Sequence, residues 1–223
     1  MSRNPLAGAS LRDFLSGDAR QLAPLLLGAV LTHEAREGMV SVRLTEVEAY
    51  LGPEDSLHPD PGSHTYRGPT PRNAPMFGPA GHLYVYFTYG MHHCTNLVCG
   101  PEGTASALLL RAGEIVDGVD LARHRRPTSK SPADLARGPA RLAKAMGMTT
   151  ADSGRDALAP PFGLVLPPRP GGPGPVGGAF PRAALPAVHT GRQHSPVRGP
   201  NRRRAFNVPL SQKTDLPFYN HFR

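Results

Sequence analysis

Hydrophobic residues recur with two different spacings along the first two thirds of the chain. Helical spacing of leucines predicts short helices over 10–17 and 19–31. Ser10 is a suitable cap for the first helix, and Val30 continues the apolar stripe of the second. Strands are predicted over 40–50, 82–90, 92–99 and 106–116, and a helix opened by Gly-Pro over 138–148. This order is typical of an α+β domain with helices around a curved mixed or antiparallel sheet.

The strand predicted over 40–50 carries an unusual run of polar residues. Side chains two apart on a strand share one face, which predicts a single row of Val42, Leu44, Glu46, Glu48 and Tyr50. The row begins with apolar residues and ends with two carboxylates and an aromatic ring. A solvent-exposed end of the face would explain the glutamates without any function. A site that needs a carboxylate beside a ring is the alternative.

A polar loop over 51–75 separates this strand from the next. Loops of this length inside a compact domain are uncommon and are usually either functional or disordered. The loop contains several side chains able to bind anions or rings, namely His58, His64, Tyr66, Arg67 and Arg72. A binding function for the loop is therefore one of its two interpretations.

Tyrosines are concentrated in the strand that follows the loop. Period two places Tyr84 and Tyr86 on one face, and Gly90 directly after Tyr89 predicts a turn or bulge that redirects that ring. Aromatic residues on strands usually belong to the core. Tyrosine also has a flat face that stacks on nucleobases and a polar tip. Both interpretations remain open at this point.

Charge is distributed unevenly along the 223 residues, whose formal net charge is +8. A basic balance favours a nucleic-acid partner. Residues 1–175 hold 17 basic against 16 acidic side chains, whereas 176–223 hold eight against one. The segment "PPRPGGPGP", 167–175, is typical of a linker. We therefore expect one globular domain over 1–166, and a poorly ordered Pro/Gly/Arg-rich linker and basic tail over 167–223.

Membrane and secretory functions are not indicated. No run of 18 apolar residues is present, and the first residues lack the pattern of a signal peptide. Cys94 and Cys99 form no CxxC motif and favour a reduced compartment. His92 and His93 lack the spacing of known zinc motifs and are predicted to be structural. We expect a cytoplasmic protein, associated with the nucleoid if it is bacterial.

Long segments of the chain resemble the alkyladenine (3-methyladenine) DNA glycosylase family, the methylpurine DNA glycosylase type. The segments are "LTEVEAYLGPED", "SHTYRGPTPRNAPMFGPAGHLYVYFTYGMHHCTNLVC" and "ALLLRAGEIVDG", followed by "GPARLAKAMGM". The resemblance runs from about residue 10 to residue 165. It implies a monomeric base excision repair enzyme that acts on duplex DNA containing damaged purines, without a metal or other cofactor.

The resemblance also implies roles for individual residues. In the family, a glutamate activates a water that cleaves the N-glycosidic bond of a purine flipped out of the duplex. Glu48 matches that glutamate, and Arg111 matches the arginine beside the water. Residues that match the family's contacts to the flipped base are Tyr50, His64, Tyr86 and Asn96, and Tyr89 matches the intercalating tyrosine.

Two segments depart from the family pattern. Extra residues around "SLHPDP", 56–61, lengthen the loop, and we choose His64 over His58 because "SHTYRG" keeps its spacing to "TPRN". Nothing after residue 170 resembles the strand and aromatic segment that close the family's active site.

Three functions follow from these observations. The first is an active DNA glycosylase. The second is a non-catalytic protein that binds DNA lesions, because the C-terminal active-site segment is altered. The third is a glycosidase that uses both Glu46 and Glu48, which would lie about 7 Å apart on one face of a strand.

Overall fold

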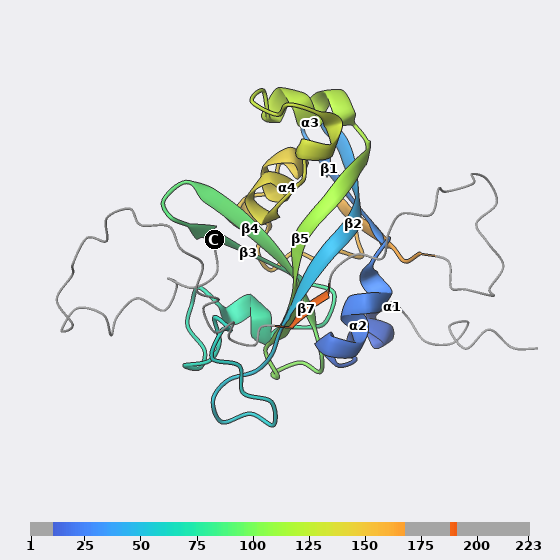
Figure 1. Cartoon of the computed structure of the whole chain (residues 1–223). Coiled ribbons are helices and arrows are strands. Elements are labelled where there is room, and N and C mark those ends of the chain that lie inside the picture. Colours follow the sequence, from blue (N-terminus) through green and yellow to red (C-terminus); the bar gives the residue numbers. More distant parts are fainter. Residues whose placement is uncertain (1–10, 168–187, 191–223) are drawn as a thin grey trace, which may run out of the picture. The chain divides into compact units, whose positions relative to one another are not determined.

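The computed structural model describes residues 11–167 and the backbone of 188–190. The proposed cap Ser10 and the rest of the predicted linker and tail lie outside the described residues. Within the described residues the chain folds as an α+β structure (Figure 1), as predicted from the sequence.

One sheet contains all the described strands. Its order is β3-β4-β5-β2-β1-β6, with neighbours antiparallel, and β7 pairs in parallel with β2. The strands are β1 Val30–Ala35, β2 Gly38–Tyr50, β3 Leu83–Thr88, β4 His92–Cys99, β5 Ser106–Asp117, β6 Phe162–Val165 and β7 Val188–Thr190. The four predicted strands are confirmed. β1, β6 and β7 were not predicted, since β6 and β7 are only four and three residues long.

The helices are short and lie mostly near the two ends of the described chain. They are α1 Leu11–Leu15, α2 Ala19–Leu26, α3 Val119–Arg125 and α4 Pro139–Met146, with 3₁₀ turns η1 Ala74–Phe77, η2 Pro132–Asp134 and η3 Thr150–Asp152. α4 confirms the helix predicted at Gly138-Pro139. α3 was not predicted.

The second predicted helix is shorter than its apolar stripe suggested. α2 starts at Ala19, is capped by Asp18, whose side chain accepts a hydrogen bond from the Arg20 amide, and ends at Leu26. Gly28 then adopts a left-handed conformation with φ +84°, which turns the chain into β1. Val30 therefore begins a strand, and the prediction that it belongs to the helix is wrong. Apolar residues in a short run fit both periods, and the glycine decides between them.

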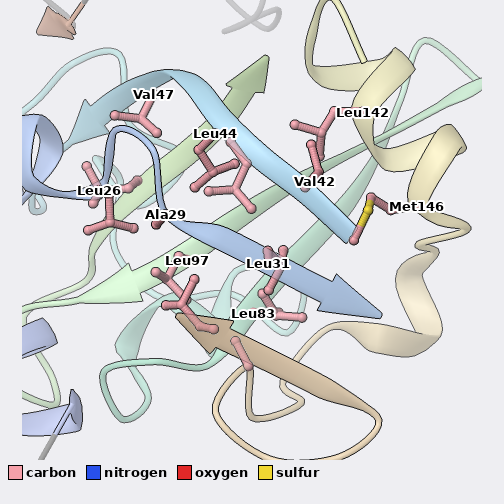
Figure 2. Close-up of a cluster of buried hydrophobic side chains, with 14 of the residues drawn as sticks. Leu26, Ala29, Leu31, Val42, Leu44, Val47, Leu83, Leu97, Leu142 and Met146 are labelled. Carbon is pink, nitrogen blue, oxygen red and sulfur yellow. The ribbon is translucent and has the colours of Figure 1, made fainter. Parts of the chain in front are cut away.

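The hydrophobic core lies between one face of the sheet and the helices. α2 packs on β2, and α4 packs on β4 and β5. Figure 2 shows side chains from these elements and from β1 and β3 converging in this core. The labelled residues are at most 1% exposed: Leu26, Ala29, Leu31, Val42, Leu44, Val47, Leu83, Leu97, Leu142 and Met146.

The predicted row along β2 changes face halfway. Val42 and Leu44 lie in the core, but so do Val47 and Ala49, so the buried positions change from even to odd numbers. The β2–β5 register shifts between Leu44 and Glu46 and again between Glu46 and Val47. Such irregularities re-aim the side chains that follow them. The prediction of one continuous row is therefore wrong, because the residues after the shift that alternate with Val47 and Ala49 point away from the core.

The β2–β5 ladder next to this register shift depends on Gly113 of β5, which pairs with Leu44. A Cβ at this position would lie 2.4 Å from Val42 Cγ2 and 2.7 Å from the Arg43 carbonyl oxygen. We expect Gly113→Ala to lower the free energy of unfolding by about 1–3 kcal/mol, because the backbone cannot move away without breaking the ladder. Denaturant titration measures the change. Gly163→Ala in β6 is the matched control, since its Cβ would meet nothing within 4 Å. An equal effect of both substitutions would contradict this account.

Candidate active site

Two carboxylates of β2 meet one guanidinium of β5. Arg111 Nε donates to Glu46 Oε2 at 3.2 Å, and Arg111 Nη1 lies 3.8 Å from Glu48 Oε2. The two glutamates differ in exposure, because the Glu48 side chain is 15% exposed and that of Glu46 is 39%. Arg111 and Glu46 lie at the register shift of the β2–β5 ladder. The structure thus brings Glu48 and Arg111 together, and it places Glu46 on the more solvent-exposed side of the arginine.

Tyr50 ends β2 two residues after Glu48 and is held in the same environment. Burial, followed by the negative charges of Glu48 and Asp60, raises the pKa of Tyr50 above its ordinary range. Tyr50 in turn contributes, behind burial and Cys94, to the raised pKa of Tyr86 on β3. The end of β2 is therefore within electrostatic range of Tyr86 on β3.

A cluster of three rings lies on the same side of the sheet as Tyr50. Tyr84 and Tyr86 stack with centroids 5.5 Å apart, and His64 meets their rings edge-on at 5.7 and 4.4 Å. His64 Nδ1 and the Tyr84 hydroxyl are hydrogen-bonded at 2.9 Å. Tyr84 packs with Met76, Val98 and Ala107 in a small second hydrophobic cluster, with Tyr86 against its edge. We call His64, Tyr84 and Tyr86 the ring cluster.

The ring cluster settles the position of the two candidate histidines. His64 is in contact with both tyrosines, whereas His58 is an exposed residue of the loop whose carbonyl accepts a hydrogen bond from the Gly52 amide. Asn73 Nδ2 donates to the carbonyls of His64 and Gly68, which fixes the loop on either side of "TYR". Of these two histidines, His64 is the one that contacts the tyrosines of β3, and its contact with a base stays a prediction.

Asn96 lies beneath the ring cluster on β4. It pairs with Tyr84 across the β3–β4 ladder, is 4% exposed, and donates from Nδ2 to the Tyr84 carbonyl at 3.1 Å. Cys94, opposite Tyr86, has a pKa raised by burial. Asn96 is therefore brought to the ring cluster as a fixed, buried amide.

Sequence reasoning did not assign two residues that belong to this site. Tyr84 is 1% exposed and binds His64, and period two already placed it on the face of Tyr86. The Arg72 guanidinium lies 5.6 Å from the Tyr86 ring centroid and donates to the Phe87 carbonyl at 3.5 Å. No sequence signal distinguishes Arg72 from Arg67, because only the loop path brings one of them over a ring.

Tyr89 lies apart from the ring cluster, at the tip of the β3–β4 hairpin. Tyr89 and Gly90 both have left-handed backbones, with φ 51° and 66°, and the Met91 amide donates to the Thr88 carbonyl at 3.2 Å across them, which makes a tight turn. The Tyr89 ring is 56% exposed, and Met91 beside it is 67% exposed. A non-glycine residue in this conformation is uncommon. The turn predicted at Gly90 is confirmed.

The short strand β7 runs beside Glu48 on the other edge of β2. β1 covers β2 only from Gly38 to Arg43, and β7 pairs with Val47, Glu48 and Ala49 beyond it. Glu48 therefore has ladder partners on both sides, Leu109 of β5 and His189 of β7. The backbone of the predicted tail reaches the site here, which composition alone did not indicate.

Within the described residues, no group of three or more His, Cys, Asp or Glu side chains is arranged to hold a metal ion. Among the helices that the structure describes, none has the length and apolar character to cross a membrane.

Tyr84 gives the site a measurable pH dependence. Burial raises the pKa of Tyr84 to about 12, against an opposing effect of Arg72, whereas an unfolded tyrosine titrates near 10. The stabilisation is complete below pH 10 and is lost as the pH rises through 12, because only the unfolded chain releases this proton between those values. We expect Tyr84→Phe to flatten the fall of the unfolding free energy in this window by about 1.4 kcal/mol per pH unit. Denaturant titrations at several pH values measure both slopes, and parallel slopes would contradict the assignment.

Comparison with known proteins gives a consistent result. The family model described as Methylpurine-DNA glycosylase (MPG) matches residues 13–173. A protein of Leifsonia xyli subsp. xyli is 55% identical over 75% of this chain and 83% of its own length, and one of Streptomyces avermitilis is 55% identical over 72% and 71%. One of Nocardia farcinica is 57% identical over 61% and 63%. All three are provisionally named 3-methyladenine DNA glycosylase. The matched region contains every side chain of the site described above, though not the β7 backbone, and the chain belongs to the methylpurine-DNA glycosylase family.

Proposed function

We propose that this chain flips a damaged purine out of duplex DNA and hydrolyses its N-glycosidic bond with Glu48 as the catalytic carboxylate. The observation that carries the proposal is the position of Glu48. The Glu48 carboxylate is largely buried and lies 3.8 Å from Arg111 Nη1. Glu48 lies two residues before Tyr50 in β2, and its negative charge helps to raise the pKa of Tyr50. Membership of the family makes the chain a DNA repair glycosylase, a hydrolase that acts on N-glycosyl bonds of alkylated purines in base excision repair.

Glu48 supplies the chemistry with a single carboxylate. An alkylated purine carries a positive charge and leaves readily, so the enzyme has to deliver water and stabilise an oxocarbenium-like sugar. Glu48 serves as the general base for the water and as the counter-charge for the sugar. Arg111 holds the carboxylate from one side, and Glu46 takes the nearer hydrogen bond from that arginine. Arg111 therefore positions Glu48 with one nitrogen, Nη1, while its Nε is bound by Glu46.

The flipped base is held between aromatic rings. Tyr50 at the end of β2 and Tyr86 on β3 provide two faces, and a cationic base adds cation–π attraction to stacking. His64, fixed by Tyr84, contacts the base or its sugar from the loop. Asn96 crowds the exocyclic amine of an undamaged guanine, and its bond to the Tyr84 carbonyl keeps it in place.

Tyr89 enters the duplex in place of the flipped nucleotide. The hairpin tip projects the exposed ring in a fixed turn, and wedging apolar side chains between bases is a common way of opening the stack. The Tyr89–Gly90 turn is compact enough for this. A monomer suffices for this mechanism, because the described residues of one chain supply every group it uses. The basic tail over 167–223 adds affinity for the phosphate backbone through its net charge.

The first test replaces the catalytic carboxylate. We expect Glu48→Gln to abolish base release from duplex DNA holding one hypoxanthine or ethenoadenine while lesion binding stays within about threefold, because amide and carboxylate have the same shape and only one accepts a proton from water. Single-turnover release and equilibrium binding are measured on the same duplexes. Release at the wild-type rate would refute the role of Glu48.

Two further variants separate the alternatives. Glu114→Gln, an exposed partner of Arg43, is the matched control. Glu46→Gln tests the two-carboxylate glycosidase, because that mechanism requires both glutamates equally. A wild-type chain that binds lesion DNA tightly and releases no base would establish the non-catalytic lesion binder, which the family comparison does not favour.

The second test separates insertion from holding. Stacking on one ring is worth roughly 1–3 kcal/mol. We expect Tyr86→Ala and Tyr50→Ala to weaken lesion binding without changing affinity for undamaged DNA, whereas Tyr89→Ala slows flipping of every lesion alike. Stopped-flow fluorescence of ethenoadenine in the duplex follows both steps. Tyr66→Ala, in the loop 51–75, is the control. Unchanged lesion affinity in all three site variants would refute the proposed ring contacts.

A further inference from the structure

Asp60 lies in the extra residues of the loop and is 7% exposed, although no step proposed above uses it. We propose that Asp60 is a positioning residue that clasps the two ends of the loop segment 51–62, and so fixes Tyr50 relative to His64. This inference rests on the proposed function, because it assumes that these two residues hold the same base.

Both oxygens of the Asp60 carboxylate are bound by backbone amides from the two ends of the segment. Oδ2 accepts from the Leu51 amide at 3.0 Å, and Oδ1 accepts from the Gly62 amide at 2.9 Å. The Asp60 amide itself donates to the Gly52 carbonyl at 3.0 Å. A charged acceptor with two amide donors makes stronger hydrogen bonds than a neutral one, more so where solvent is excluded.

The two amides belong to residues next to the site. Leu51 directly follows Tyr50, and Gly62 lies two residues before His64. The Ser63 amide also donates to the Asp60 carbonyl at 2.9 Å, which continues the clasp toward His64. Beyond His64, Asn73 holds the chain through the His64 carbonyl. One carboxylate therefore connects the residue after one base-holding ring to the turn that delivers the other.

The loop has one further connection between its two ends, because the Glu54 amide donates to the Tyr66 carbonyl at 2.9 Å. Near Tyr50 the loop is also held by the Gly52–His58 and Gly52–Asp60 backbone bonds, which do not reach Gly62. Without the Asp60 carboxylate the segment keeps these backbone bonds and its local turn at Ser56, whose hydroxyl binds the Pro53 carbonyl. Leu51 and Gly62 would lose their shared partner, so the separation of Tyr50 and His64 would be less tightly fixed while the ring stacking of Tyr84 on Tyr86 remains.

The test uses three variants of the full chain. Asp60→Asn replaces one acceptor by an amide NH₂ that faces a backbone N–H, so it loses one bond and adds a repulsion. Asp60→Ser keeps a short acceptor for the Gly62 amide two residues on, but it does not reach Leu51. Asp55→Asn is the matched control, because it makes the same chemical change at an exposed residue of the same loop.

The first measurement is lesion discrimination, the ratio of affinities for ethenoadenine duplex and undamaged duplex. We expect Asp60→Asn to lower this ratio roughly tenfold or more, Asp60→Ser to lower it less, and Asp55→Asn to leave it unchanged. Affinity for undamaged DNA stays constant in all of them, which a general loss of folding would not produce. Unchanged discrimination in Asp60→Asn, with active wild-type chain, overturns the inference and leaves the proposed function intact.

The second measurement does not depend on activity. Hydrogen exchange of the free chain, below its unfolding temperature, reports the Leu51 and Gly62 amides directly. In Asp60→Asn we expect the amide that faces the new NH₂ group to exchange much faster, and the other amide, left with a neutral acceptor, to exchange somewhat faster. In Asp60→Ser we expect only the Leu51 amide to exchange faster. If the wild-type chain neither discriminates nor releases lesions, the proposed function fails. Hydrogen exchange alone then tests whether the Asp60 carboxylate holds the Leu51 and Gly62 amides. Equal protection of both amides in wild type and Asp60→Asn overturns the inference. Should Asp60→Asn not fold, Asp60→Ser gives the same decision at Leu51.

Discussion

The irregular ladder between β2 and β5 is the constraint on which the site depends. The regular alternation of a strand would bury the residues after Leu44 in the same phase as Val42. The register shift at Glu46 reverses that phase, so Val47 and Ala49 take the core positions. Glu48 can then leave the apolar face without leaving the sheet. Glu48, the carboxylate proposed to be catalytic, is held by ladder pairing on both sides of its strand, which a loop residue lacks.

The two carboxylates at this register shift differ in their exposure to solvent and in their distance from Arg111. Glu46 is the more exposed carboxylate and takes the closer contact with Arg111, and Glu48 lies deeper at 3.8 Å. The arginine offsets two negative charges with one positive charge, so the local balance stays negative. Such a balance is consistent with the proposed mechanism, in which a cationic base binds and positive charge develops on the sugar.

Within the described residues, the loop 51–75 contacts the tyrosines of β3 through His64. Loops tolerate insertions, and this one has taken up extra residues around Asp60. Its two ends are nevertheless fixed by buried polar side chains, Asp60 near Tyr50 and Asn73 near His64. Because these groups bind backbone amides and carbonyls, they specify the loop path more than its composition does. Asp60 and Asn73 therefore hold the loop on both sides of His64, so the position of His64 in the ring cluster depends on these bonds.

The sequence by itself determined the α+β class, four strands, the helix at Gly138-Pro139 and the turn at Gly90, because these rest on local periodicity and on glycine and proline geometry. The motifs also singled out Glu48, Arg111 and His64 as candidates before any geometry was known, and their roles stay predictions. Tertiary structure decided where β1 begins, which face Glu48 takes, how Arg72 reaches Tyr86 and where residues 188–190 pair. Each of these depends on hydrogen bonds or contacts between residues far apart in the chain. Local spacing contains no information on them, since a one-residue shift in a ladder exchanges the two faces of a strand.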